Sequence, residues 1–210
     1  MRLTIFGASG STGTHLVEQA LVRGHLVTAV VRGEHSFGEH DRLTVVTADV
    51  MDPADIADAL DGADAVLSAV GARQKGPTSV CADAAESIAA AMDKTGARRL
   101  LLVSNSARIA GPGDEPFTRY VVKPLILRPL LRHSLDDMSR AESIVEATDL
   151  DWTIVRAPQL TDNPAKGRSR MAVERNVTFG IRITRADLAT RMLDLVSDRD
   201  AVHRHVNVAN

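Results

Sequence analysis

Aromatic side chains are scarce in this chain. They make up 3% of its 210 residues, as four Phe, one Tyr and one Trp. Proteins that hold single-stranded nucleic acid stack its bases on aromatic rings, so the composition disfavours that function. The net charge of −2 supplies no strong field for a nucleic-acid backbone or an acidic lipid surface. We therefore expect neither nucleic acid nor membrane as a partner, and a core of Ala, Val, Leu and Ile.

Cysteine and long apolar runs are equally scarce. Cys81 is the single cysteine, which excludes an internal disulfide and suits the cytoplasm. The sequence has no run of about 18 apolar residues, the length that a membrane-spanning helix needs. Gly7 interrupts the N-terminal apolar run too early for a signal-peptide core. These absences predict a cytoplasmic protein, and the length predicts one domain over residues 1–210.

Short apolar runs alternate with helical patterns along the chain. Gly, Asp or Ser bounds each run, which is typical of strands buried on both faces. This β–α alternation predicts an α/β fold with a parallel sheet and helices on both faces. The expected strands are 3–6, 26–31, 43–48, 65–70, 100–103, 152–155 and 203–208. The expected helices are 13–24, 52–60, 82–94, 134–147 and 186–196.

One motif directly follows the first expected strand and opens the first helix. Its three glycines, Gly7, Gly10 and Gly13, are spaced three apart. The first permits a tight turn, the second lets a pyrophosphate approach the backbone, and the third lets helix and strand pack closely. Free N–H groups at the helix N-terminus can hold the anion. The motif predicts a dinucleotide site rather than a turn without a ligand, formed by Gly7, Ser9, Gly10, Ser11, Thr12 and Gly13.

The end of the second expected strand bears on which dinucleotide binds. An acidic residue about 20 positions beyond the glycines bonds the ribose 2′-hydroxyl in NAD-binding chains. Here the strand ends in Arg32, and a guanidinium suits a 2′-phosphate through paired hydrogen bonds. We therefore expect NADP(H) to be preferred. Glu34 lies two residues on and could serve the NAD role, so NAD(H) remains possible.

Further motifs carry a resemblance that covers nearly the whole chain. With the glycine loop and Val31-Arg32, the chain resembles an atypical short-chain dehydrogenase/reductase of the NAD(P)H-binding, NmrA-like branch, which includes biliverdin-IX-beta (flavin) reductase. The resemblance implies a Rossmann-type doubly wound parallel sheet with a small C-terminal substrate-side extension. The other matching segments are Ala48-Asp49-Val50, Ser68-Ala69-Val70-Gly71, Val103-Ser104-Asn105-Ser106-Ala107, residues 151–158 and residues 184–189.

The resemblance also implies roles for individual residues. Asp49 and Val50 would lie against the adenine, and Ala69, Val70 and Gly71 beside the cofactor's ribose. Ser106 would face the nicotinamide as the first catalytic candidate. Ser104 is the second and would also touch the cofactor. Arg156 and Gln159 would lie on the substrate side, and the basic stretch 166–170 could attract an anionic acceptor or be a solvated loop.

The chain departs from the Tyr-x-x-x-Lys pair of members with proton-donor chemistry. Its single tyrosine, Tyr120, precedes Lys123 by three positions, and Pro124 follows. Met138 occupies the place where the branch often has a lysine. Tyr120 stays a catalytic candidate, with packing inside its loop as the alternative. The prolines of residues 111–135 predict a loop with one or two short helices, and we expect lid-like and substrate-side segments over 111–183, beyond a dinucleotide-binding core at 1–110.

These features favour an NADPH-dependent oxidoreductase that transfers hydride to a small planar acceptor such as a flavin or a quinone. A non-catalytic NADP(H) sensor that regulates a protein partner is the alternative, and a nucleotide-sugar epimerase or dehydratase is less favoured. No metal is expected. His203 and His205 would share one face of an edge strand, but a third ligand is not evident. The oligomeric state stays open.

Overall fold

An eight-stranded sheet forms the centre of the molecule. The computed structural model describes residues 1–72 and 76–210. Within these residues the strand order is β3-β2-β1-β4-β5-β6-β10-β8. Neighbouring strands are parallel except β10 and β8, which run antiparallel. The strands are β1 Arg2–Phe6, β2 Leu26–Val31, β3 Leu43–Thr47, β4 Ala65–Ser68, β5 Arg99–Asn105, β6 Asp151–Ala157, β8 Arg170–Val173 and β10 Arg204–Ala209.

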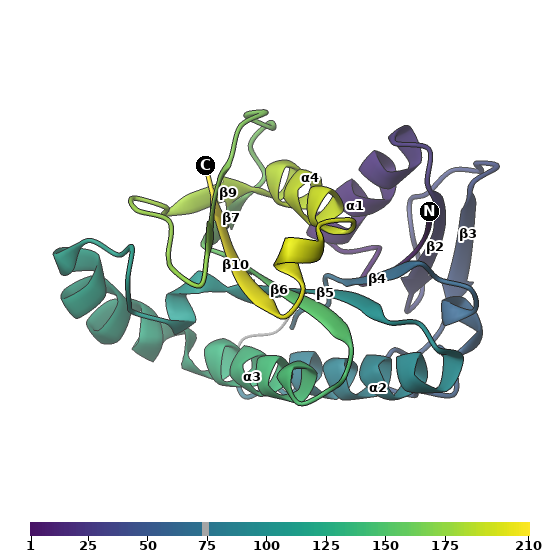
Figure 1. Ribbon diagram of the computed structural model, residues 1–210, viewed down its shortest axis with the longest axis horizontal. Helices are drawn as coiled ribbons and strands as arrows, with labels where there is room; N and C mark the ends of the chain where they lie inside the picture. Colours follow the sequence, from purple (N-terminus) through teal and green to yellow (C-terminus); the bar gives the residue numbers. More distant parts are fainter. Residues whose placement is uncertain (73–75) are drawn as a thin grey trace.

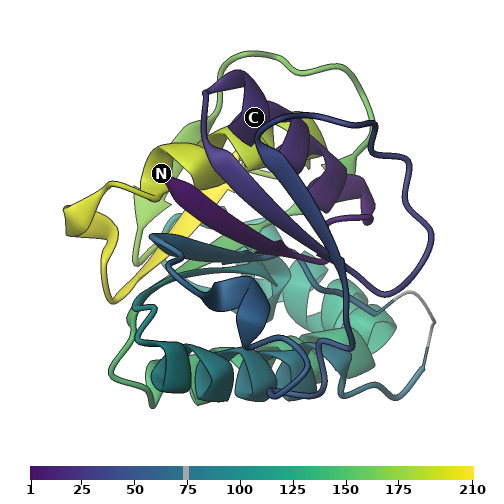
Figure 2. The same ribbon diagram turned by 90° about the vertical axis from the view of Figure 1, so that its right-hand side faces the viewer.

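Four α-helices cover the two faces of this sheet, and the predicted fold class is confirmed. Helices α1 (Ser11–Val22) and α4 (Arg185–Leu195) lie together on one face, and α2 (Val80–Thr95) and α3 (Arg128–Glu146) lie together on the other (Figures 1 and 2). A small parallel pair, β7 (Gln159–Thr161) and β9 (Arg182–Thr184), adds to the C-terminal part. The arrangement is a Rossmann-type sheet, with β3-β2-β1-β4-β5-β6 in the usual order.

Aliphatic side chains fill both layers between sheet and helices. Leu16, Val17 and Leu188 pack on the α1–α4 face, and Ile88 and Val145 pack on the α2–α3 face. Alternate residues of β5 and β6 enter opposite layers because successive side chains of a strand point to opposite faces. This alternation decides which residues near the ends of β5 and β6 face α3.

The expected helix at 52–60 does not form. The segment makes turns and only a short 3-10 helix at Asp58–Leu60. Side-chain oxygens bind the backbone locally: Asp52 Oδ1 accepts from the Ala54 N–H at 2.8 Å, and Asp55 Oδ2 accepts from the Asp49 N–H. Such bonds compete with helical hydrogen bonding. They prevent the helix that Asp52-Pro53, an N-cap residue followed by proline, would otherwise begin.

Residues 118–146 form one continuous helical segment instead of the predicted loop followed by a helix. A π-helix runs over Thr118–Leu127 and continues directly into α3 (Figure 1). Pro124 lies inside the π-helix, and Pro129 lies just after the junction with α3, so each removes one backbone N–H from the continuous helical segment. The prolines therefore change the type of helix rather than ending it.

Two further expectations about the C-terminal part need correction. β10 begins at Arg204 and lies between β6 and β8, so it is not an edge strand. His203 precedes it with a φ of 56° and is therefore not a strand residue.

In the part of the chain that the structure describes, we find no helix both long and apolar enough to cross a bilayer.

Candidate functional site

A cleft opens at the carboxyl ends of β1, β2 and β4. Gly7 follows β1, Arg32 follows β2, and Ala69 follows β4, which brings the predicted phosphate loop and the predicted ribose segment together. Ligands of open α/β sheets bind at this edge. The cleft is lined by Gly7, Ser9, Gly10, Val30, Val31, Arg32, Ala48, Val50, Met51, Ala69, Val70, Gly71 and Val80.

The glycine loop has no room for side chains. Gly7 has a φ of 71°, and a Cβ there would lie 2.8 Å from the Ala69 carbonyl oxygen. A Cβ on Gly13 would lie 2.1 Å from the Gly7 oxygen. Gly10 caps α1 without any side-chain hydrogen bond from the described residues, and the first turn holds no acidic residue. The first amides of α1 are therefore left for an anion, which fits the pyrophosphate of a dinucleotide.

Most residues predicted to contact the cofactor line this cleft or adjoin it. Ser11, Thr12 and Gly13 form the first turn of α1 directly behind the lining residues. Asp49 is one exception among the predicted contacts: it is exposed, and its Oδ1 accepts from the Met51 N–H at 3.0 Å. Met51 and Val80 line the cleft without a signal in the sequence, because their positions depend on turns and on the start of α2.

Ser106 begins the short 3-10 helix Ser106–Arg108 that directly follows β5, and it is not among the residues that line the cleft. Its hydroxyl makes no hydrogen bond to the described residues. Its carbonyl oxygen accepts from Lys123 Nζ at 3.1 Å. Lys123 is 5% exposed and also binds the Ile109 carbonyl and the Asp114 carboxylate. Burial lowers the pKa of Lys123, and the Asp114 carboxylate offsets only part of that effect. The lysine is thus a buried clamp that fixes the Ser106 backbone.

The Ser104 hydroxyl is committed to a buried carboxylate. Its side chain is buried, and its hydroxyl donates to Glu142 Oε1 at 2.5 Å. Ser104 was predicted as a cofactor contact and catalytic hydroxyl, but in this structure its hydroxyl is bound to Glu142, and Ser104 is not among the residues that line the cleft. Ser104 follows Leu100 and Leu102 on the β5 face that packs against the α2–α3 layer.

Glu142 is the centre of that buried network. Arg156 reaches both of its oxygens, with Nε at 3.1 Å and a terminal nitrogen at 2.5 Å, and Arg108 also bonds it. Burial alone would raise the pKa of Glu142, but the Arg156 hydrogen bonds and charge, helped by Ser104 and Arg108, lower it overall. Arg156, predicted as a substrate contact, is 5% exposed, and its guanidinium is paired with Glu142.

Sequence reasoning missed Glu142, although a signal was present. On α3 the residue lies four positions after Met138 and three before Val145, so it falls on the apolar face of the helix. A carboxylate on such a face is almost always paired. The strand residue that pairs with it, Arg156, lies similarly between buried apolar neighbours.

The structure contains no Tyr–Lys proton-donor pair within the described residues. Tyr120 is 65% exposed, on the outer side of the π-helix, with the Arg119 guanidinium 5.3 Å from its ring. Lys123 is buried against Asp114. Met138 is half-buried against the α2–α3 core. Tyr120 therefore does not lie beside a lysine that could lower its pKa.

The remaining substrate-side candidates lie away from the cleft. Gln159 is exposed on β7, and its Oε1 accepts from Arg182 Nε at 3.2 Å. Lys166 and Arg168 are exposed, in a loop anchored by backbone bonds from Lys166 and Gly167 to Asp187. The structure does not bring these residues to the phosphate loop.

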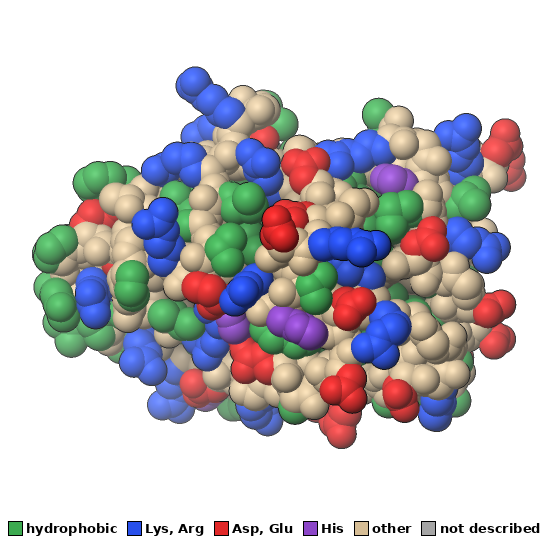
Figure 3. All heavy atoms as spheres, in the orientation of Figure 1, with side chains coloured by type: hydrophobic (Ala, Val, Ile, Leu, Met, Phe, Trp, Pro, Cys, Tyr) green, Lys and Arg blue, Asp and Glu red, His purple; other side chains and the backbone are tan. Residues whose placement is uncertain are grey.

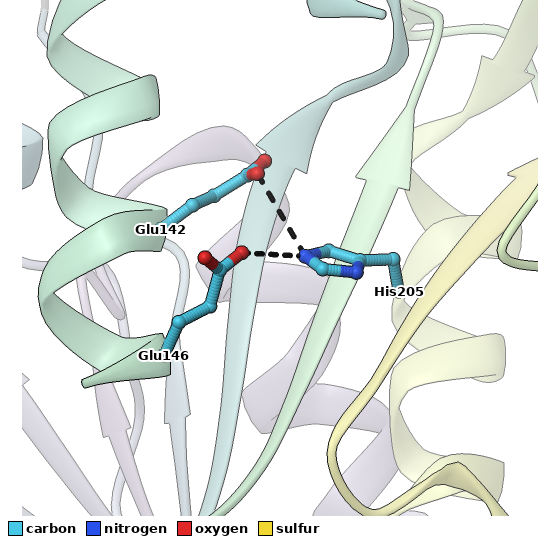
Figure 4. Close-up of side chains that lie close together, drawn as sticks. All are labelled: Glu142, Glu146 and His205. Carbon is cyan, nitrogen blue, oxygen red and sulfur yellow. Dashed lines mark hydrogen bonds and ion pairs between the residues drawn. The ribbon is translucent and has the colours of Figure 1, made fainter. Parts of the chain in front are cut away.

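A second, separate cavity of about 310 Å³ lies on the α3 side of β6 and β10. It shares no lining residue with the cleft. On the face of the molecule that Figure 3 shows, histidine side chains lie near the middle, among acidic and basic groups. Glu142, Glu146 and His205 converge there (Figure 4).

Comparisons with known proteins agree with this geometry. YwnB, an uncharacterized protein of Bacillus subtilis, is 25% identical over 201 residues, 92% of this chain and 91% of that one. A short-chain dehydrogenase/reductase of Veillonella parvula in complex with NADP has a TM-score of 0.83 at 18% identity, with 100% and 94% of the chains covered. ChuY, an anaerobilin reductase of Escherichia coli, has a TM-score of 0.77 at 22% identity, with 100% and 97% covered.

A family model provides the most direct assignment. The model of the NAD(P)H-binding family matches residues 7–199, which include the glycine loop, Arg32 and the network around Glu142. The predicted NAD(P)H class of cofactor is confirmed by this match. With its phosphate loop, cleft and Rossmann-type sheet, the chain belongs to the NAD(P)H-binding family.

Proposed function

We propose that the protein is an NADPH-dependent reductase that transfers hydride to a small planar acceptor. The observation that carries the proposal is the cleft itself, in which Arg32 lies at the same edge as the glycine loop. A guanidinium there provides the paired hydrogen bonds that a 2′-phosphate accepts. Glu34 is exposed and is not among the residues that line the cleft, which favours NADPH over NADH.

The choice of acceptor follows from what the chain's own residues can supply. Bound nicotinamide would supply the hydride, and the residues at the end of β5 would orient the two rings. Ser106 has a free hydroxyl and a backbone fixed by Lys123. It can hold the nicotinamide amide or the acceptor, but it has no Tyr–Lys pair beside it. An acceptor that takes its proton from water, such as a flavin or a quinone, needs no such pair.

The missing pair also favours a second candidate, a non-catalytic NADP(H) sensor. Tyr120 is exposed and Lys123 is buried against Asp114, so the described residues contain no Tyr–Lys pair arranged as a proton donor. A sensor would bind the cofactor without turning it over, and cofactor binding would alter its affinity for a protein partner.

One experiment separates the two candidates. Purified protein is mixed with NADPH and, in turn, with flavins, quinones and biliverdin, and cofactor oxidation is followed by absorbance while NADPH and NADH binding are titrated in parallel. Turnover of one acceptor with NADPH preferred supports the reductase. Tight NADPH binding without turnover on any acceptor supports the sensor, and absence of NADPH binding refutes both.

A further inference from the structure

A histidine between three carboxylates dominates the second cavity. His205 Nδ1 lies 3.2 Å from Glu174 Oε2. Its Nε2 lies 2.7 Å from Glu146 Oε1 and 4.0 Å from Glu142 Oε2. Glu142 and Glu146 project from one face of α3 toward His205 on β10 (Figure 4).

These contacts leave acceptor atoms facing one another. A carboxylate oxygen only accepts hydrogen bonds, and a neutral imidazole has a single N–H, so it can donate to one side alone. When Nδ1 donates to Glu174, Nε2 presents a lone pair. That lone pair faces Glu146 and Glu142, which are also acceptors. Such a convergence is stable only with a cation between the atoms, either a proton or a metal ion.

A second observation at the same cavity favours the metal ion. Asn207 lines the cavity and is 3% exposed, and its Oδ1 has no hydrogen-bond partner among the described residues. Asn207 lies two residues after His205 on β10, so both side chains share one face of the strand. A proton shared by His205 and Glu146 would leave this buried oxygen unsatisfied, whereas a metal ion or its bound water would satisfy it.

From these contacts we propose a binding site for a divalent transition-metal ion of the zinc class, with Glu146 and His205 as ligands and Asn207 Oδ1 as the third. Ligand atoms about 2.0–2.2 Å from zinc lie roughly 3.3–3.6 Å from each other in a tetrahedral site. The 2.7 Å between His205 Nε2 and Glu146 Oε1 is shorter than this range, so these two side chains must move slightly apart to admit the ion. Imidazole with oxygen donors is a set that suits zinc and related ions.

The surrounding residues complete the arrangement. Glu174 on the second ring nitrogen fixes the histidine tautomer, as the carboxylate partners of metal-bound histidines do. Glu142 is already held by Arg156 and Arg108, so it adds charge near the ion rather than a direct ligand. The cavity opens to solvent beside Glu146, whose side chain is 37% exposed, which gives the ion a path of entry.

Zinc titration of the whole chain tests the site. The protein is freed of metal with a chelator, dialysed and titrated with Zn²⁺ by calorimetry, and with Co²⁺ by its visible absorption. We expect one ion per chain. Glu146→Gln and His205→Gln should each weaken binding at least tenfold, and Glu174→Gln should weaken it about 10–100-fold through ring orientation.

His203→Gln is the matched control. The His203 and His205 rings lie 5.5 Å and 5.4 Å from the Trp152 ring, but His203 Nε2 contacts the Leu150 carbonyl. This variant should bind Zn²⁺ like the wild type. If His205→Gln fails to fold, the exposed Glu146→Gln carries the test. Absence of Zn²⁺ binding at micromolar concentration, or equal binding by folded wild type and Glu146→Gln, overturns the proposal.

The outcome is independent of the proposed reductase. None of the three ligands lines the dinucleotide cleft, so NADPH affinity should be unchanged in the Glu146→Gln protein. Loss of metal with intact NADPH binding identifies this cavity as a site of its own.

Discussion

Substituting alanine for Gly13 tests the packing of the phosphate loop. The new Cβ would lie 2.1 Å from the Gly7 oxygen and 2.7 Å from the Ala8 Cα. Ordinary contacts between heavy atoms are about 3.5–4.0 Å, so helix and loop must separate by more than about 1 Å. Overpacking of this kind costs about 1–3 kcal/mol. A chain of this size loses about 2–4 °C of Tm per kcal/mol, so Gly13→Ala should lower Tm by about 2–12 °C and weaken NADPH binding.

Helix propensity alone predicts the opposite sign. Gly13 lies inside α1, where alanine would otherwise gain about 1 kcal/mol over glycine. Thermal unfolding and NADPH titration of the variant measure both effects. Gly38→Ala is the control, since a Cβ there meets nothing within 4 Å and Gly38 does not line the cleft. A Gly13→Ala protein as stable as the wild type, with unchanged NADPH affinity, would refute the close-packing argument.

Three other predictions concern separate parts of the molecule. Arg32→Ala should weaken NADPH binding about 10–100-fold, because hydrogen bonds to a charged group are lost, and it should leave NADH binding unchanged. Equal losses for both cofactors in parallel titrations would contradict the 2′-phosphate role. Glu142→Gln should cost about 3–5 kcal/mol at neutral pH by breaking the buried pair with Arg156, as urea unfolding would measure. The pKa of Glu142 is lower in the folded protein than in the unfolded chain. The carboxylate therefore stabilises the fold above the unfolded pKa of about 4.3, and this stabilisation is lost as the pH falls through the folded pKa. The Glu142→Gln variant should thus lose less stability than the wild type on acidification. Burial, reinforced by Asp137, raises the pKa of Cys81 to about 12, so the native thiol should resist alkylation at pH 8 and react only on unfolding; rapid native labelling would contradict its burial.

The fold could be predicted from the sequence because its signals are local. The first strands are short apolar runs with clear boundaries, and the expected strand at 26–31 matches β2 to the residue. The failures lie where local patterns compete. At 52–60, Asp52 and Asp55 bind the backbone in turns. At 118–146, a π-helix accommodates Pro124 where a break was expected.

The candidate site divides in the same way. The phosphate loop is a contiguous motif in a fixed strand–turn–helix context, so Gly7, Gly10 and Arg32 could be assigned to one cleft. Roles that depend on the direction of a side chain near the end of a strand could not be assigned from the sequence. Ser104 and Ser106 are two positions apart, yet one hydroxyl is bound to Glu142 and the other is free of such a bond. The partner on α3 decides this difference, and a motif does not contain it.

The buried clamp of Lys123 also bears on how the loop after β5 moves. Lys123 Nζ binds the Ile109 carbonyl and Asp114, and Asn176 Nδ2 binds the same two groups, each at 2.9 Å. Two distant segments thus fasten one loop, and its opening must break both sets of bonds together. Amide hydrogen exchange over 106–114 should therefore be slow and cooperative with that of the 174–177 turn. The loop is in that sense a fixed wall of the second cavity, which Arg108, Ile109 and Pro112 line, so any change in the shape of that cavity must come from its other walls.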